Sequence, residues 1–102
     1  MYNGRRGTNM EINQNEQAFY IGDDYTNALA RLVFRNTDFG MVLEHTEVDA
    51  SLAGQGIGRA LVKYAVEVAR NEKFQLAVEC EYAQSEFKKH PDYEDVLYKE
   101  KI

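Results

Sequence analysis

The sequence is poor in the features that mark disulfide-rich, membrane-spanning and nucleic-acid-binding chains. It contains a single cysteine, so no disulfide can form within the chain, and a reducing compartment is the natural setting. No apolar run approaches the roughly 18 residues of a transmembrane helix, and the N-terminus lacks the apolar core of a signal peptide. The net charge of −5 argues against binding held mainly by nucleic-acid phosphates. We therefore expect a cytoplasmic protein with neither a nucleic-acid nor a membrane partner.

The length of the chain sets the expected domain organisation. A chain of 102 residues can form one domain that buries about 60–70% of its unfolded surface. Residues 1–9 are expected to form a flexible leader, and residues 10–102 a single domain. The leader contains two arginines, Arg5 and Arg6, which are too few to indicate a nucleic-acid-binding arm.

Three glycines within five positions, Gly54, Gly56 and Gly58, stand at the start of a helical pattern. Glycine is unfavourable inside a helix or strand but suits a sharp bend that brings bare N–H groups close to a partner. A glycine turn that opens a helix also presents unpaired donors and a partial positive charge of about half a unit. We interpret this turn as a loop that holds a phosphate group of a cofactor. The alternative is a turn that only connects a strand to a helix.

Two other kinds of phosphate loop do not fit these glycines. The loop of nucleotide hydrolases needs a lysine directly after its last glycine, and none follows here. The dinucleotide fingerprint needs glycine or alanine in its third glycine position. Counting from Gly54 places Arg59 in that position, and counting from Gly56 places Leu61 there.

The segments before the glycine turn have the pattern of an antiparallel meander. Short strand-like segments begin at Met10 and cover 18–21, 28–35 and 41–48, and the polar turns between them cover 13–16, 22–24 and 36–38.

After the turn the period changes to that of a helix of about four turns, ending near Asn71. Its expected apolar face consists of Ile57, Ala60, Leu61, Tyr64, Ala65, Val68 and Ala69. A strand over 75–80 follows and should pair in parallel with the strand over 41–48, because a strand–helix–strand crossover is right-handed and parallel. A short helix over 83–90 should stop at Pro91, and 93–98 is either a last strand or a loop. The predicted fold class is mixed α+β, with an antiparallel meander followed by a β-α-β unit.

Four blocks of sequence, in this order and at this spacing, resemble the GNAT superfamily of acyl-CoA-dependent N-acetyltransferases. The similarity is greatest to its smallest branch, the Yjdj-type single-domain proteins, and extends over about 11–97. The blocks are His45-Thr46-Glu47-Val48, Gly54-Gln55-Gly56-Ile57-Gly58, Cys80-Glu81-Tyr82-Ala83 and His90-Pro91-Asp92-Tyr93. The chain departs from the pattern at Ala53, where members usually carry Gln or Arg, and at Val78, where the branch often has proline.

The resemblance implies an acetyl-CoA site between the splayed ends of the strands over 41–48 and 75–80. It implies that the pyrophosphate is held by the loop residues Gly54, Gln55, Gly56, Ile57, Gly58 and Arg59. The pantetheine arm would pair with the main chain of Thr46, Glu47 and Val48. Arg59 and Lys63 could bind the phosphates nearer the adenosine, or could belong to a solvated helix face in which Lys63 pairs with Glu67.

The resemblance also implies candidate catalytic residues. Cys80 should lie near the thioester and could accept the acetyl group transiently, although most lone cysteines are inert buried residues. His45 could face Cys80 as a base or hydrogen-bond partner, or could simply be a packed or solvated residue. Glu47 is another possible base, because a two-residue period places it on the strand face of His45. Tyr82 could protonate the leaving thiolate.

The expected function is an N-acetyltransferase that moves an acetyl group from acetyl-CoA to a small amine or a protein lysine. A non-catalytic acyl-CoA-binding or sensor module is the alternative, and an acidic interaction domain without a ligand is a weaker one. The two histidines and the cysteine are too widely spaced to suggest a metal site. We expect a monomer or a weak dimer.

Overall fold

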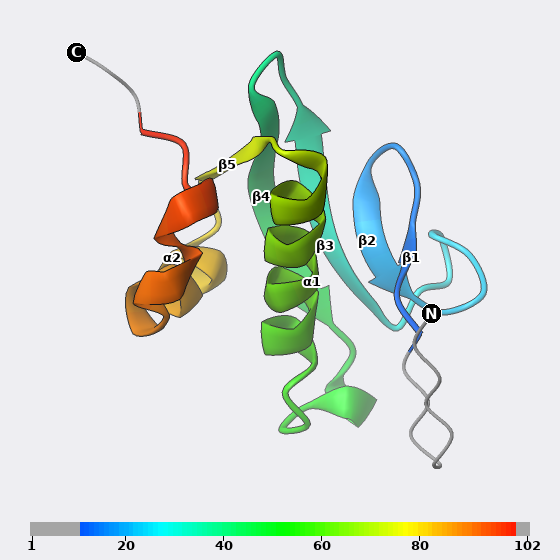
Figure 1. The fold of residues 1–102 in the computed structure, drawn as a ribbon. Helices are drawn as coiled ribbons and strands as arrows, with labels where there is room; N and C mark the ends of the chain where they lie inside the picture. Colours follow the sequence, from blue (N-terminus) through cyan, green and yellow to red (C-terminus); the bar gives the residue numbers. More distant parts are fainter. Residues whose placement is uncertain (1–10, 100–102) are drawn as a thin grey trace.

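The computed structural model describes residues 11–99, so the leader expected over 1–9 lies outside the described residues. Its sheet has five strands in the order β1-β2-β3-β4-β5, and α1 runs across one face of it (Figure 1). The elements are β1 (Asn13–Gln14), β2 (Ala18–Ile21), β3 (Ala30–Asn36), β4 (Gly40–Val48), the 3-10 helix η1 (Ala50–Leu52), α1 (Ile57–Glu72), β5 (Gln75–Val78), α2 (Glu81–Lys89) and the 3-10 helix η2 (Pro91–Val96).

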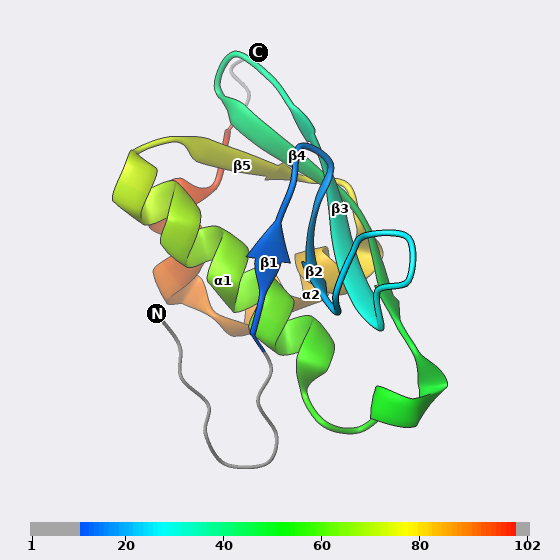
Figure 2. The ribbon, with the colours of Figure 1, turned by 90° about the vertical axis from the view of Figure 1, so that its right-hand side faces the viewer.

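The strand pairing confirms the predicted mixed α+β class. Strands β1 to β4 pair antiparallel in chain order, and β5 joins the edge of β4 in parallel after the crossover through α1. Figure 2 shows α1 lying across the sheet, with the β1–β2 hairpin at the opposite edge from β5. Helix α2 and η2 lie beside α1 next to β5, so one core serves the whole sheet.

The buried face of α1 is wider than the sequence predicted. Val62 and Val66 are fully buried, whereas Tyr64 and Val68, which were predicted to belong to the face, are only partly buried at its margin. The difference arises because α1 packs against α2 and η2 as well as against the sheet. A helix with neighbours on two sides needs a broader apolar stripe.

Several predicted boundaries differ from the observed ones. The first strand is Asn13–Gln14, where a turn was expected, because the Asn15 carboxamide accepts the N–H groups of Gln17 and Ala18 and places the turn later. Helix α1 ends at Glu72, one residue after Asn71, and is capped by Lys73, which takes the left-handed conformation at φ 64°. Residues 93–98, expected to be a strand or a loop, belong mainly to the 3-10 helix η2, which ends at Val96. Tyr98 follows it, and its N–H donates to the Leu76 carbonyl of β5.

A β-bulge in β4 decides which of its side chains face the core. Val33 of β3 is paired with His45, but the next residue, Phe34, is paired with Leu43, so Glu44 is an extra residue in β4. An extra residue shifts the two-residue alternation by one. Thr46 therefore shares the inner face with Leu43, and the residues on either side of Thr46 point outward.

The aromatic contacts of Phe19 in β2 predict how much its loss lowers the free energy of unfolding. Phe19 is fully buried, with its ring centroid 4.9 Å from that of Phe34 and 5.5 Å from that of Tyr64. Phe19→Ala should lower the free energy of unfolding by about 3–5 kcal/mol in urea denaturation, since it leaves a cavity. The neighbouring Tyr20 is half-buried on the opposite face, and Tyr20→Ala should cost about 1 kcal/mol. Equal losses would contradict the assignment of the core to one face.

Candidate functional site

The candidate site begins where β4 and β5 separate. Their parallel pairing ends at Leu43 and Val78, and the N–H groups of Glu79 and Cys80 both donate to the Leu43 carbonyl, at 2.9 and 3.0 Å. Beyond this point β4 continues to Val48, and no strand among residues 11–99 pairs with it on the β5 side. The edge of β4 from 44 to 48 is therefore free to pair with an extended ligand.

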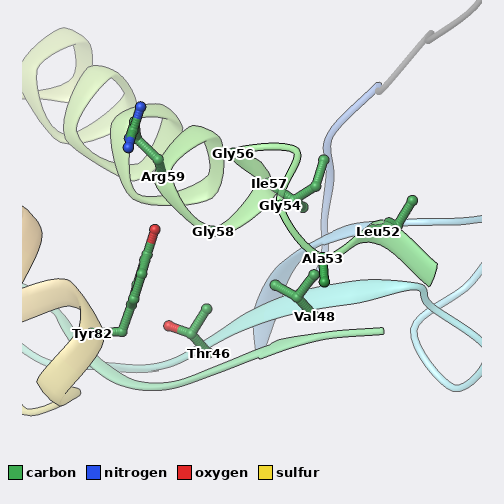
Figure 3. Close-up of a pocket in the computed structure, with 10 residues that line it drawn as sticks. All are labelled: Thr46, Val48, Leu52, Ala53, Gly54, Gly56, Ile57, Gly58, Arg59 and Tyr82. Carbon is green, nitrogen blue, oxygen red and sulfur yellow. The ribbon is translucent and has the colours of Figure 1, made fainter. Parts of the chain in front are cut away.

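A cavity of about 500 Å³ lies between this part of β4 and the start of α1 (Figure 3). Its wall is formed by β4, by η1 and the glycine loop, by the first turn of α1, and by one tyrosine of α2. The lining residues are Thr46, Val48, Leu52, Ala53, Gly54, Gly56, Ile57, Gly58, Arg59 and Tyr82. The glycine loop and the free strand edge, which are separate in sequence, thus border one space.

The glycine loop leaves backbone donors at this wall. Gly54 and Gly56 have φ angles of 81° and 74°, a left-handed conformation that side chains rarely adopt. The first bond of α1 runs from the Ala60 N–H to the Gly56 carbonyl, at 3.0 Å, and no side chain caps the helix. The N–H groups of 57–59 consequently have no acceptor inside the helix. Together with the helix dipole they favour a bound anion.

Gly58 allows Tyr82 to lie directly against α1. A Cβ atom added at Gly58 would lie 2.9 Å from Cε2 of the Tyr82 ring. In Figure 3 the Tyr82 hydroxyl points toward Arg59, while the hydroxyl of Thr46 points toward the ring. Burial, reinforced by the negative charge of Glu86, raises the pKa of Tyr82, so its hydroxyl stays protonated. This orientation makes the hydroxyl a donor at the Arg59 end of the cavity.

Cys80 lies behind the cavity wall and is only 8% exposed. It follows β5 and is the N-terminal cap of α2, and its Sγ lies 3.1 Å from Oγ1 of Thr46. Thr46 therefore connects the sulfur to the cavity. Sequence reasoning assigned only the main chain of Thr46 to the site and missed this side-chain contact, since it depends on the bulge at Glu44.

The expectation that His45 faces Cys80 is wrong. His45 is on the outer face of the sheet, where its side chain is 59% exposed and its Nε2 lies 2.9 Å from Oε2 of Glu47. The bulge at Glu44 causes this reversal, because an unbroken two-residue period would have turned His45 inward. Glu47 also accepts a hydrogen bond from Nε of Arg31 at 2.9 Å. The Arg31 bond, and to a smaller extent His45, lower the pKa of Glu47, so this carboxylate is a weak base at neutral pH.

Most of the expected cofactor-binding residues lie together at the cavity. The seven that line it are Thr46, Val48, Gly54, Gly56, Ile57, Gly58 and Arg59, whereas Glu47 and Gln55 do not. Sequence reasoning did not place Leu52 in the site, and it treated Ala53 only as a departure from the family pattern. Their position directly before the first glycine is a local signal that could have indicated that both line the cavity.

Residues 11–99 contain no group of three or more histidine, cysteine or acidic side chains that could hold a metal ion. Within the same part of the chain, no helix has both the length and the apolarity needed to cross a membrane.

The chain belongs to the GCN5-related N-acetyl-transferase family, whose sequence profile matches residues 18–96. It is also similar to a Staphylococcus aureus protein solved by NMR and named a "GCN5-like putative N-acetyltransferase". The two chains share 39% sequence identity, with 92% of this chain and 93% of the other covered and a TM-score of 0.72. No curated protein matches the chain. The family and the structural neighbour together place the chain in the GNAT class of acetyltransferases.

The close contact between Gly58 and the Tyr82 ring predicts the effect of adding a methyl group at position 58. Gly58→Ala should displace the Tyr82 ring, because the new Cβ would overlap it, and the Tyr82 ring resonances should shift in NMR spectra. Gly54→Ala is the control, since its Cβ would meet nothing within 4 Å and its cost is backbone strain of about 1–2 kcal/mol. Unchanged Tyr82 resonances in the Gly58 variant would show that the ring does not pack against this glycine.

Proposed function

We propose that the cavity binds acetyl-CoA and that the protein transfers the acetyl group to an amine. The observation that carries the proposal is that the free edge of β4 and the uncapped start of α1 border the same cavity. Neither feature alone identifies a ligand. Side by side, they suit a molecule with a diphosphate at one end and an extended amide chain at the other, which is the chemical form of coenzyme A.

In this proposal the diphosphate lies against the glycine loop. The main-chain N–H groups of 54 and 56–59 would donate to its oxygens, and Arg59 would add a positive charge. Arg59 lines the cavity, with its side chain 63% exposed, and can reach a ligand without a backbone movement. Gln55 is the weakest candidate in this loop, because it does not line the cavity and its N–H donates to the Leu52 carbonyl at 3.3 Å.

The pantetheine arm would extend along Thr46, Glu47 and Val48. An amide chain can add to an exposed sheet edge through main-chain hydrogen bonds. Thr46 and Val48 turn their side chains into the cavity, so they would also contact the arm. The thioester would then lie toward the point where β4 and β5 separate, beside Thr46 and Cys80.

Acetyl transfer requires an uncharged amine nucleophile. A lysine-like amine has a reference pKa of about 10.4, so deprotonation at neutral pH costs about 4–5 kcal/mol unless a base or a desolvating pocket assists. Cys80 could form a transient thioester: its sulfur would bond to the acetyl carbon as the bond to the coenzyme sulfur breaks, and the thiol proton would pass to the departing coenzyme thiolate. The acceptor amine would then attack the acetyl carbon, the bond to Cys80 would break, and a proton of the amine would return to the Cys80 sulfur. His45 would have to act from the opposite face of the sheet, so Cys80 is the stronger candidate.

A non-catalytic acyl-CoA-binding module is the second candidate function. The burial of Cys80 behind Thr46 favours it, because an acyl acceptor needs access to the thioester. Both functions are compatible with a cytoplasmic monomer or weak dimer, and the single cysteine fits a reducing compartment. Only the first requires an amine acceptor.

Mass spectrometry of the intact protein after incubation with acetyl-CoA distinguishes these functions. We expect a mass gain of one acetyl group that disappears in Cys80→Ala, because the sulfur is the acceptor. Calorimetry should show that Cys80→Ala still binds coenzyme A, since the buried sulfur does not line the cavity. Binding without transfer to Cys80 or to a panel of amines would support the binding module. Absence of binding at millimolar coenzyme A would contradict both functions.

A further inference from the structure

The proposed diphosphate site has a buried negative charge beside it. Glu86 of α2 is 1% exposed and is the one buried charged residue among those the structure describes. Its Oε1 atom accepts no hydrogen bond from residues 11–99. A buried carboxylate oxygen without a donor is costly, and an apolar side chain at this position would pack without that penalty.

Two cationic side chains, Arg59 and Lys89, and the imidazole ring of His90 surround the Glu86 carboxylate without a close contact. Nε of Arg59 lies 3.8 Å from Oε1, Nε2 of His90 lies 3.4 Å from the same atom, and Nζ of Lys89 lies 3.7 Å from Oε2. These distances exceed those of good charge-assisted hydrogen bonds, about 2.7–2.9 Å. The carboxylate thus lies near the positive charges of Arg59 and Lys89, while its Oε1 atom remains without a hydrogen bond.

Arg59 and Tyr82 connect Glu86 to the cavity. Both line the cavity, and Figure 3 shows the Tyr82 hydroxyl directed toward Arg59. Tyr82 lies one helical turn before Glu86 on α2, and the negative charge of Glu86 contributes to its raised pKa after burial itself. The two cavity donors nearest the start of α1 therefore face a fixed anion in the ligand-free chain.

We propose that Glu86 competes with the phosphate groups of a ligand for Arg59 and Tyr82, and so weakens the binding of coenzyme A and speeds its release. This inference rests on the proposed diphosphate site. An incoming diphosphate must share the charge of Arg59 with Glu86 and is repelled by the carboxylate. Affinity differences of this kind are expressed mainly in the dissociation rate.

Glu86→Gln tests the inference because it removes the charge and keeps the shape. Calorimetry should show coenzyme A and inorganic pyrophosphate binding about three- to tenfold more tightly than to the wild type. Pantetheine lacks the diphosphate and should bind both proteins equally. Mere structural damage would weaken binding, so a gain confined to ligands with phosphates separates the two explanations.

Glu81→Gln is the matched control, because it removes the same charge from an exposed position in the first turn of α2. It should change pyrophosphate affinity by less than about twofold. If Glu86→Gln does not fold, Glu86→Met provides a neutral side chain of similar length. Combining the substitution with Arg59→Gln should reduce the gain, since the competition acts through Arg59.

Unchanged or weaker pyrophosphate binding in the folded Glu86 variant would overturn the inference, as would an equal gain for pantetheine. Absence of pyrophosphate binding in every variant would overturn it too. Pyrophosphate binding without coenzyme A binding would instead contradict the proposed function. The effect of Glu86 could then still be measured from the pyrophosphate affinities of the wild type and the variant.

Discussion

The arrangement of the site depends on how β4 ends its pairing with β5. The Leu43 carbonyl accepts the last two N–H groups from the β5 side, and the bulge follows immediately at Glu44. The first feature frees the edge of β4, and the second turns Thr46 into the gap. Without the bulge, β4 would still have a free edge, but the side chain of His45 instead of Thr46 would point into the cavity. One extra residue therefore decides which chemistry faces the cavity.

The cavity is not lined by a uniform basic patch: a positive and a negative side chain lie close together at its Arg59 end. The chain is acidic overall, yet the first turn of α1 contains no acidic residue and begins with uncapped N–H groups. Arg59 adds a positive charge there, and buried Glu86 partly offsets it. An acidic protein can bind an anion in this way, because the local backbone dipoles and one arginine act at short range.

Local signals were sufficient to predict the meander, the parallel strand after α1 and the role of the glycines as a helix opening. Each rests on periodicity or on glycine spacing. The bulge was not predictable, because 44–47 are all polar and provide no apolar alternation that would reveal a change of face. The burial of Glu86 was not predictable either. A glutamate in a polar helix is expected to be exposed, and Glu86 is buried only through tertiary packing. The end of α1 was predicted to within one residue, because the helix stops at Glu72, but Lys73 as its left-handed cap was not predicted.

The central claim is that the glycine loop and the free edge of β4 hold one coenzyme molecule together. A titration of the labelled protein with coenzyme A, followed through its backbone amide resonances, tests this most directly. The account predicts that the resonances of 54–59 and 46–48 shift together with a single dissociation constant, while those of β1 and β2 remain in place. Amides of the glycine loop and β4 that do not move at saturating coenzyme A would contradict it.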